Sequence, residues 1–161
     1  MKKILYLFAA LLLPVLVFIF LKFFGKNEFQ VEPLFVHEPP QLQAGCLIPQ
    51  LPYHVPDSIL DQFSFGQDSL MLILFAKQEG DVKRNLDHLG RDFESLASTL
   101  VVNDSLNSQT DFLKKCIFFL PEPFDLVLVH HSGQIRGQYQ ARDREDIDRL
   151  ITELTIILKK Y

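Results

Sequence analysis

The chain has 161 residues, enough for one domain and little more. It contains 16 Lys and Arg against 20 Asp and Glu, and every acidic residue lies after position 27. The part beyond position 27 therefore combines 12 cations with 20 anions, a net charge of −8. Such acidity repels phosphate backbones and anionic bilayer surfaces, so it argues against a nucleic-acid-binding protein and against a domain lying flat on a membrane.

The N-terminal 24 residues differ from the rest of the chain. Residues 4–20 contain no charge, and the apolar run continues to Phe24, interrupted by Lys22. About 20 apolar residues suffice to cross ~30 Å of hydrocarbon, so the sequence predicts a transmembrane anchor over 1–24 that enters the membrane through residues 4–24. The alternative is a cleaved signal peptide, although the exit Phe23-Phe24-Gly25-Lys26 is a poor cleavage site. The cations at Lys2 and Lys3 favour a cytoplasmic N-terminus.

Residues 25–60 form a second region, marked by prolines. Six prolines lie between positions 33 and 56, too densely for a helix or a central strand. The region is therefore predicted to be an extended tether that packs on the following domain through its apolar residues: Leu34, Phe35, Leu47, Ile48, Tyr53 and Val55.

Residues 61–161 read as an α/β domain. The apolar run 70–75 is typical of a strand buried on both faces. Asp81 is the expected N-cap of an amphipathic helix, and residues 99–102 form a second short strand after it. The apolar residues of this helix recur every three or four positions: Val82, Leu86, Leu89, Phe93 and Leu96.

The C-terminal part predicts a hairpin and a helix. A single helical turn is expected over 110–115, followed by strands 126–129 and 135–139 around a turn that contains Gly133. A helix capped by Asp143 then turns these apolar residues toward the sheet: Ile147, Leu150, Ile151, Leu154, Ile157 and Leu158. The predicted domain is a small mixed sheet flanked by helices.

This order of elements is the thioredoxin order, and two segments make the likeness more specific. VLVHHSGQIRGQY at 127–139 and DREDIDRLITEL at 143–154 resemble the closing hairpin and C-terminal helix of the SCO/SenC proteins, which are membrane-anchored bacterial proteins. The resemblance implies a thioredoxin-like fold, a bacterial inner-membrane location with the domain in the periplasm, and a role in respiratory (cytochrome) oxidase or copper-centre assembly.

The same resemblance exposes a missing site. Copper-binding members use two cysteines after the first strand and a histidine before the hairpin, a donor set that suits copper. Here the loop 76–83 has no cysteine, and aligning Gly133 places Glu122 at the histidine position. The chain is therefore expected to be a redox-inactive member with a pseudo-active site: not an enzyme, without catalytic residues or a cofactor, and acting by binding a protein partner.

Cys46 and Cys116 are the only cysteines, 70 residues apart. In an oxidising compartment they can form a disulfide that stabilises the domain by ~3–4 kcal/mol, or they can be two separate buried thiols. A redox or copper-transfer protein that uses Cys46 and Cys116 is the second functional hypothesis. A tethered structural module unrelated to copper is the third.

Two further features remain open at this point. His130 and His131 are adjacent, so on a strand their side chains should point to opposite faces, and they are weak metal candidates together with Cys46 or Cys116. Pro121 and Pro123 lie near the position at which thioredoxin folds carry a cis-proline, and the sequence does not decide between them.

Overall fold

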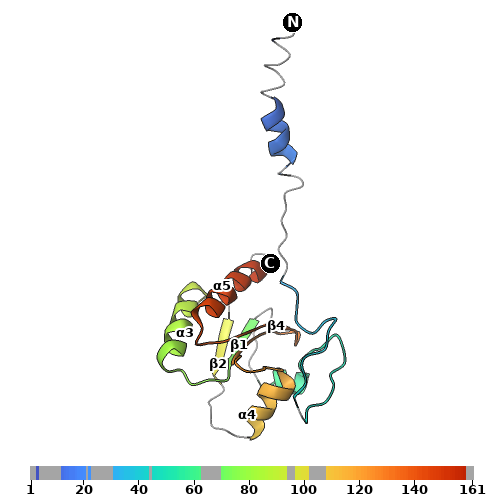
Figure 1. Cartoon of the computed structure of the whole chain (residues 1–161), viewed down its shortest axis with the longest axis vertical. Helices are drawn as coiled ribbons and strands as arrows, with labels where there is room; N and C mark the ends of the chain where they lie inside the picture. The colour runs from blue at the N-terminus through green and yellow to red at the C-terminus, as the bar shows by residue number, and fades with distance from the viewer. Residues whose placement is uncertain are drawn as a thin grey trace. The chain divides into compact units, whose positions relative to one another are not determined.

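A computed structural model describes residues 3, 12–20, 22, 31–43, 45–62, 70–93, 97–101 and 108–158. The chain divides into two compact units, 1–30 and 31–161, which are treated separately below (Figure 1).

The first unit contains a helix over residues 12–20, all of whose side chains are exposed. Among the described residues, no helix is both long enough and apolar enough to cross a membrane. Most of the remaining positions of the predicted anchor over 4–24 lie outside the described residues.

The second unit is built on a four-stranded mixed sheet. Its strands are β1 (Leu70–Leu74), β2 (Ala97–Val101), β3 (Leu126–His130) and β4 (Ile135–Tyr139), in the spatial order β2-β1-β3-β4. β1 pairs parallel with β2, while β3 is antiparallel to both β1 and β4. All five residues of β1 are buried, as the continuous apolar run predicts. The predicted small mixed sheet of an α/β domain is confirmed.

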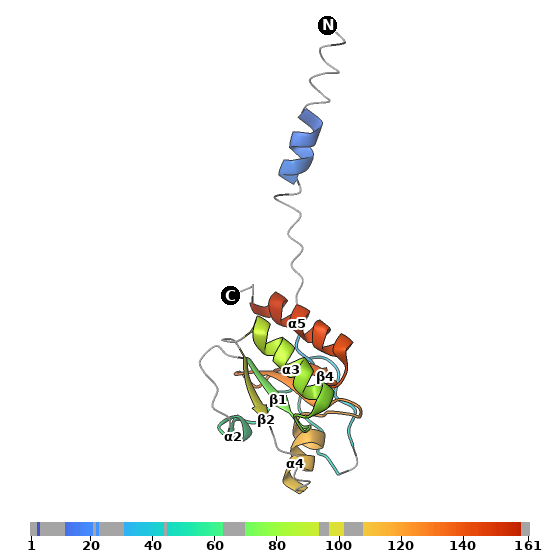
Figure 2. The same ribbon diagram turned by 90° about the vertical axis from the view of Figure 1, so that its left-hand side faces the viewer.

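Two long helices cover one face of this sheet (Figure 2). They are α3 (Gly80–Asp92) and α5 (Arg144–Leu158). The predicted cap of α5 is confirmed, because Asp143 Oδ1 accepts a hydrogen bond from Glu145 N at 3.0 Å. The predicted cap of α3 is wrong: Glu79 is the N-cap, and Asp81 lies inside the first turn. The helices bury these residues against β1 and β3: Val82, Leu89, Ile147, Leu150, Leu154 and Ile157.

The opposite face packs against shorter elements. The predicted turn at 110–115 is part of a longer helical segment, α4 (Ser108–Phe112) followed by the π-helix η1 (Leu113–Ile117). A four-residue helix, α2 (Asp57–Leu60), ends the tether. The core on this side consists of Val55, Leu60, Met71, Ile73, Phe75, Phe118, Leu120, Val127, Val129 and Ile135.

The tether lies along the hairpin and is bonded to it. Leu34 N donates to Ile135 O at 2.8 Å, and Arg136 Nη2 donates to Val31 O at 2.8 Å. Val55 N donates to Gly133 O at 2.8 Å, and a Cβ on Gly133 would lie 2.8 Å from Val55 O. Gly133 also has φ +83°, which glycine adopts most readily.

The predicted packing of the tether is partly wrong. Leu34, Phe35, Tyr53 and Val55 contact the core as expected. Leu47 and Ile48, however, are 89% and 80% exposed. Leu47 and Ile48 follow Cys46, and the disulfide between Cys46 and Cys116 attaches this stretch of the tether to the domain.

Candidate functional site

A pocket of about 480 Å³ lies where β1 ends. Three segments meet there, one after β1, one before β3 and one after β4, and η1 adds Lys114 as a fourth. Backbone hydrogen bonds join the first three, from Phe75 N to Asp125 O at 2.7 Å and from Asp125 N to Tyr139 O at 3.1 Å. The pocket is lined by Phe75, Ala76, Lys77, Glu79, Lys114, Glu122, Pro123, Asp125, Gln140 and Arg142. Charged side chains therefore dominate its wall.

An ion pair crosses one side of the pocket. Lys114 Nζ donates to Glu122 Oε1 at 2.9 Å. The Lys114 side chain is 18% exposed, whereas the Glu122 side chain is 80% exposed. The cation is thus held by the fold, while its partner carboxylate reaches in from solvent. The Glu122–Pro123 peptide bond is cis, as is Leu51–Pro52, and Pro123 lines the same pocket.

Asp125 provides a carboxylate that is already engaged. Its Oδ1 accepts a hydrogen bond from Ala141 N at 2.7 Å. Burial raises the pKa of this carboxyl, opposed by the hydrogen bond from Ala141 and by the charges of Lys114 and Arg142. The side chain therefore fixes the turn after β4 and places two cations around itself.

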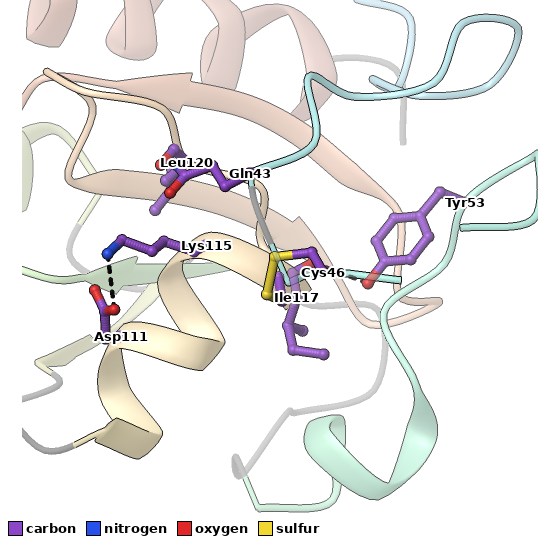
Figure 3. The surroundings of a disulfide bond; sticks show 8 residues. Gln43, Cys46, Tyr53, Asp111, Lys115, Ile117 and Leu120 are labelled. Atoms are coloured by element: carbon purple, nitrogen blue, oxygen red, sulfur yellow. Dashed lines mark hydrogen bonds and ion pairs between the residues drawn. A yellow bond between two sulfur atoms is a disulfide. The ribbon is translucent and has the colours of Figure 1, made fainter. Parts of the chain in front are cut away.

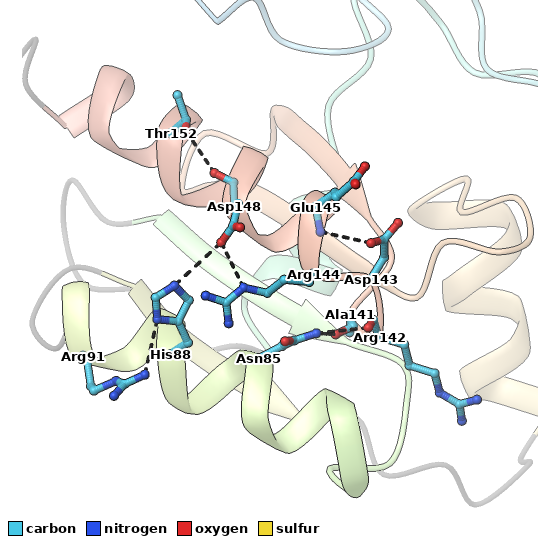
Figure 4. Close-up of polar contacts among 10 residues, drawn as sticks. All are labelled: Asn85, His88, Arg91, Ala141, Arg142, Asp143, Arg144, Glu145, Asp148 and Thr152. Atoms are coloured by element: carbon cyan, nitrogen blue, oxygen red, sulfur yellow. Dashed lines mark hydrogen bonds and ion pairs between the residues drawn. The ribbon is translucent and has the colours of Figure 1, made fainter.

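Two cations of the pocket, Lys77 and Arg142, make no direct side-chain contact among the described residues, although the charge of Arg142 acts on Asp125. The side chains of Lys77 and Arg142 are exposed, and within the described part of the chain neither has a hydrogen bond or ion pair. The backbone of Arg142 is fixed, since its carbonyl accepts a hydrogen bond from Asn85 Nδ2 at 3.1 Å. Its guanidinium points away from Asn85 (Figure 4).

The two cysteines are bonded to each other away from this pocket. Cys46 and Cys116 form a disulfide with a Cα–Cα distance of 5.1 Å, which joins the tether to η1 (Figure 3). Both residues are half-buried, and neither lines the pocket. Beside the bond, Tyr53 OH donates to Ile117 O at 2.8 Å, and burial raises the pKa of Tyr53 to about 12.

The expected geometry of the two histidines is wrong. The ring centroids of His130 and His131 are 4.1 Å apart, so the rings lie together rather than on opposite faces. The reason is that β3 ends at His130 and His131 begins the turn. His130 Nδ1 lies 2.8 Å from Ser132 Oγ. Over the described residues, no group of three or more His, Cys, Asp or Glu side chains is placed to hold a metal ion.

The sequence pointed to only part of this site. Lys77 and Glu79 lie in the loop singled out by its missing cysteines, and Glu122 was aligned with a lost ligand position. Lys114, Asp125 and Arg142 were not identified. Their positions carry no motif, and only the pairing of three distant segments brings them together.

Comparison with known proteins found no match: no family model fits the chain, and no curated protein matches it.

Proposed function

We propose that the chain is a membrane-anchored, redox-inactive thioredoxin-like protein that binds a protein partner through the pocket at the end of β1. The SCO/SenC resemblance suggests an accessory role in respiratory oxidase or copper-centre assembly. In this proposal residues 4–24 anchor the chain in the bacterial inner membrane, and the domain lies in the periplasm.

The sheet supports the thioredoxin-like part of the proposal. The order β2-β1-β3-β4, with β3 antiparallel to the other strands, is the order that a thioredoxin-like domain would be expected to have. The long helices α3 and α5 also follow β1 and β4 in the thioredoxin order.

The observation that carries the proposal is the content of the pocket. The loop after β1 and the segment before β3, where the resemblance would place copper ligands, converge on one pocket. Lys77, Glu79 and Glu122 line it there, and none of these is a soft sulfur or imidazole donor. The concave surface is retained with a chemistry suited to ionic contacts.

The position of the disulfide supports a structural rather than a catalytic role. Thiol–disulfide exchange needs a thiolate, usually stabilised at a helix N-terminus or by a neighbouring cation within one short loop. Cys46 and Cys116 instead come from the tether and from the last part of a helical segment. Their bond closes a long loop, which is the arrangement that stabilises a small extracytoplasmic domain.

A gene deletion tests the proposed role. Oxidase activity is measured in copper-limited cells that lack the gene, and the proposal predicts a decrease that the wild-type gene restores. A gene that encodes the Cys46→Ser/Cys116→Ser variant should restore oxidase activity in proportion to the amount of folded protein, because the two cysteines have no catalytic role in this proposal. Normal oxidase activity in the deletion strain would instead support a structural module unrelated to copper.

One observation favours a second function. Because Cys46 and Cys116 are already within bonding distance, the pair can in principle cycle between dithiol and disulfide or hold copper when reduced. An insulin-reduction assay distinguishes this redox or copper-transfer alternative. If the chain is redox-inactive, the wild-type protein should reduce insulin no faster than the Cys46→Ser/Cys116→Ser variant does.

A further inference from the structure

We propose that the pocket at the end of β1 binds carboxylate side chains from an acidic segment of the partner. Lys77 and Arg142 contact the carboxylates of the partner. The third cation, Lys114, is paired with Glu122 until a carboxylate of the partner displaces Glu122. This inference rests on the proposed function, because it names the partner chemistry of the same pocket.

The cations of the pocket stand out against the charge of the domain. The chain beyond residue 27 has a net charge of −8, yet three cations line this one pocket. Lys77 and Arg142 are exposed and, within the described residues, neither side chain has a hydrogen bond or a close ion pair, although the charge of Arg142 acts on Asp125. Charge-assisted hydrogen bonds to carboxylates are the strong contacts open to such groups, with Arg offering a bidentate one.

Within the described residues, no carboxylate of the pocket forms a close ion pair with Lys77 or Arg142, although the charge of Arg142 acts on Asp125. Asp125 accepts the hydrogen bond from Ala141 N and lies half-buried at the base of the turn. Glu122 is paired with Lys114. Glu79 is exposed at the N-terminus of α3, where the helix dipole favours a negative charge. Lys77 and Arg142 are therefore left available for an incoming anion.

Glu122 shows how such an anion can bind. Its side chain is 80% exposed, so it can leave Lys114 without opening buried structure. A carboxylate from the partner can then take the same position on Lys114, whose side chain is only 18% exposed and stays in place. Glu122 thus acts as an internal competitor for the partner.

The size and lining of the pocket are compatible with a side chain of a peptide. Its volume of about 480 Å³ lies within the range usual for ligand-binding pockets. Phe75 and Pro123 give the wall an apolar part for the stem of a Glu side chain.

Fluorescence anisotropy tests the proposal with the full-length chain in non-ionic detergent. The probe is a fluorescein-labelled Glu-rich peptide, compared with the same peptide carrying Gln at every Glu. Lys77→Gln and Arg142→Gln should each weaken binding of the Glu peptide by about 3–5-fold, as expected for exposed charge pairs. Glu122→Gln should tighten it by about 2–5-fold, because the competitor is removed. Lys83→Gln, on the exposed face of α3, makes the same charge change outside the pocket and should have no effect.

Each possible result decides the proposal. Equal binding of the Glu and Gln peptides, or equal loss in Lys77→Gln and Lys83→Gln, would overturn it. Weaker binding in Glu122→Gln would show that Glu122 supports the site rather than competes for it. Competition by inorganic phosphate as effective as that by unlabelled Glu peptide would show a general anion site and overturn the peptide assignment. If these tests fail while the deletion strain still loses oxidase activity, the accessory role in oxidase assembly stands, but its assignment to this pocket falls and another surface binds the partner.

Discussion

Cys46 and Cys116 are covalently joined across 70 residues of sequence, and their bond fixes the tether to η1. Around it, Gln43 Nε2 donates to Leu120 O at 3.4 Å and Tyr53 OH donates to Ile117 O at 2.8 Å. In Figure 3 these contacts flank the disulfide on the same side of the domain. The tether is thus fixed at Gln43, Cys46 and Tyr53 to the face opposite α3 and α5.

Removing the disulfide should destabilise the domain without changing its fold. Because the bond closes a 70-residue loop, the Cys46→Ser/Cys116→Ser variant should lose about 3–4 kcal/mol of unfolding free energy. Urea denaturation of the full-length chain measures the loss. Reduction of the wild-type protein is the matched control and should give the same midpoint. An unchanged midpoint in both samples would contradict a stabilising role for the bond.

Gly137→Ala should disturb the hairpin. A Cβ at this position would overlap the hydroxyl of Tyr139, which is buried and donates a hydrogen bond to Glu153 Oε2. Displacing that hydroxyl costs its hydrogen bond and forces repacking, so a loss of about 2–3 kcal/mol is expected from urea denaturation. Gly90→Ala in α3 is the control, since nothing lies within 4 Å of its Cβ position. It should stabilise by about 0.5–1 kcal/mol.

Alkaline pH should weaken the contact between the tether and η1. Burial raises the pKa of Tyr53 from 10.0 to about 12. An unfolded chain releases this proton near pH 10, while the folded chain holds it to about pH 12, so unfolding free energy falls as pH rises between these values. Tyr53→Phe should cost about 1 kcal/mol at neutral pH through its lost hydrogen bond. The variant should also show a shallower decline in denaturation midpoint from pH 10 to 12, and an unchanged decline would contradict this assignment.

Copper titration separates the two functional hypotheses. In the oxidised chain both thiols are consumed by the disulfide, and His130 and His131 lie beside the hairpin turn. We therefore expect no stoichiometric copper binding to the oxidised full-length protein. Stoichiometric binding that appears only on reduction, and is lost in Cys46→Ser, would favour the copper-transfer alternative.

The core elements could be predicted because their side-chain periodicity is strong. The run 70–75 matches β1 within one residue, and the apolar spacing from Ile147 to Leu158 lies within α5, which begins directly after the predicted cap Asp143. The hairpin strands were equally clear from the turn at Gly133. In each case the burial pattern follows from the sequence itself.

The features that were missed depend on tertiary contacts. Leu47 and Ile48 are as apolar as Leu34 and Phe35, but no described part of the domain covers them. The ring geometry of His130 and His131 was missed because it assumes that both residues lie on a strand, whereas β3 ends at His130 and His131 begins the turn. In the sequence, Lys114 and Arg142 look like ordinary surface charges. Only the fold brings their segments together at the pocket.

Copurification of the full-length protein from its own membranes shows directly whether the pocket holds a protein partner. Wild type, Lys83→Gln and Lys77→Gln/Arg142→Gln are isolated in parallel, with and without reductant, and the bound protein is quantified by mass spectrometry. We expect a non-covalent partner that is recovered with wild type and Lys83→Gln, independently of reductant, and is depleted with the pocket variant. A partner recovered as a mixed disulfide with Cys46 or Cys116, and retained by the pocket variant, would contradict this expectation.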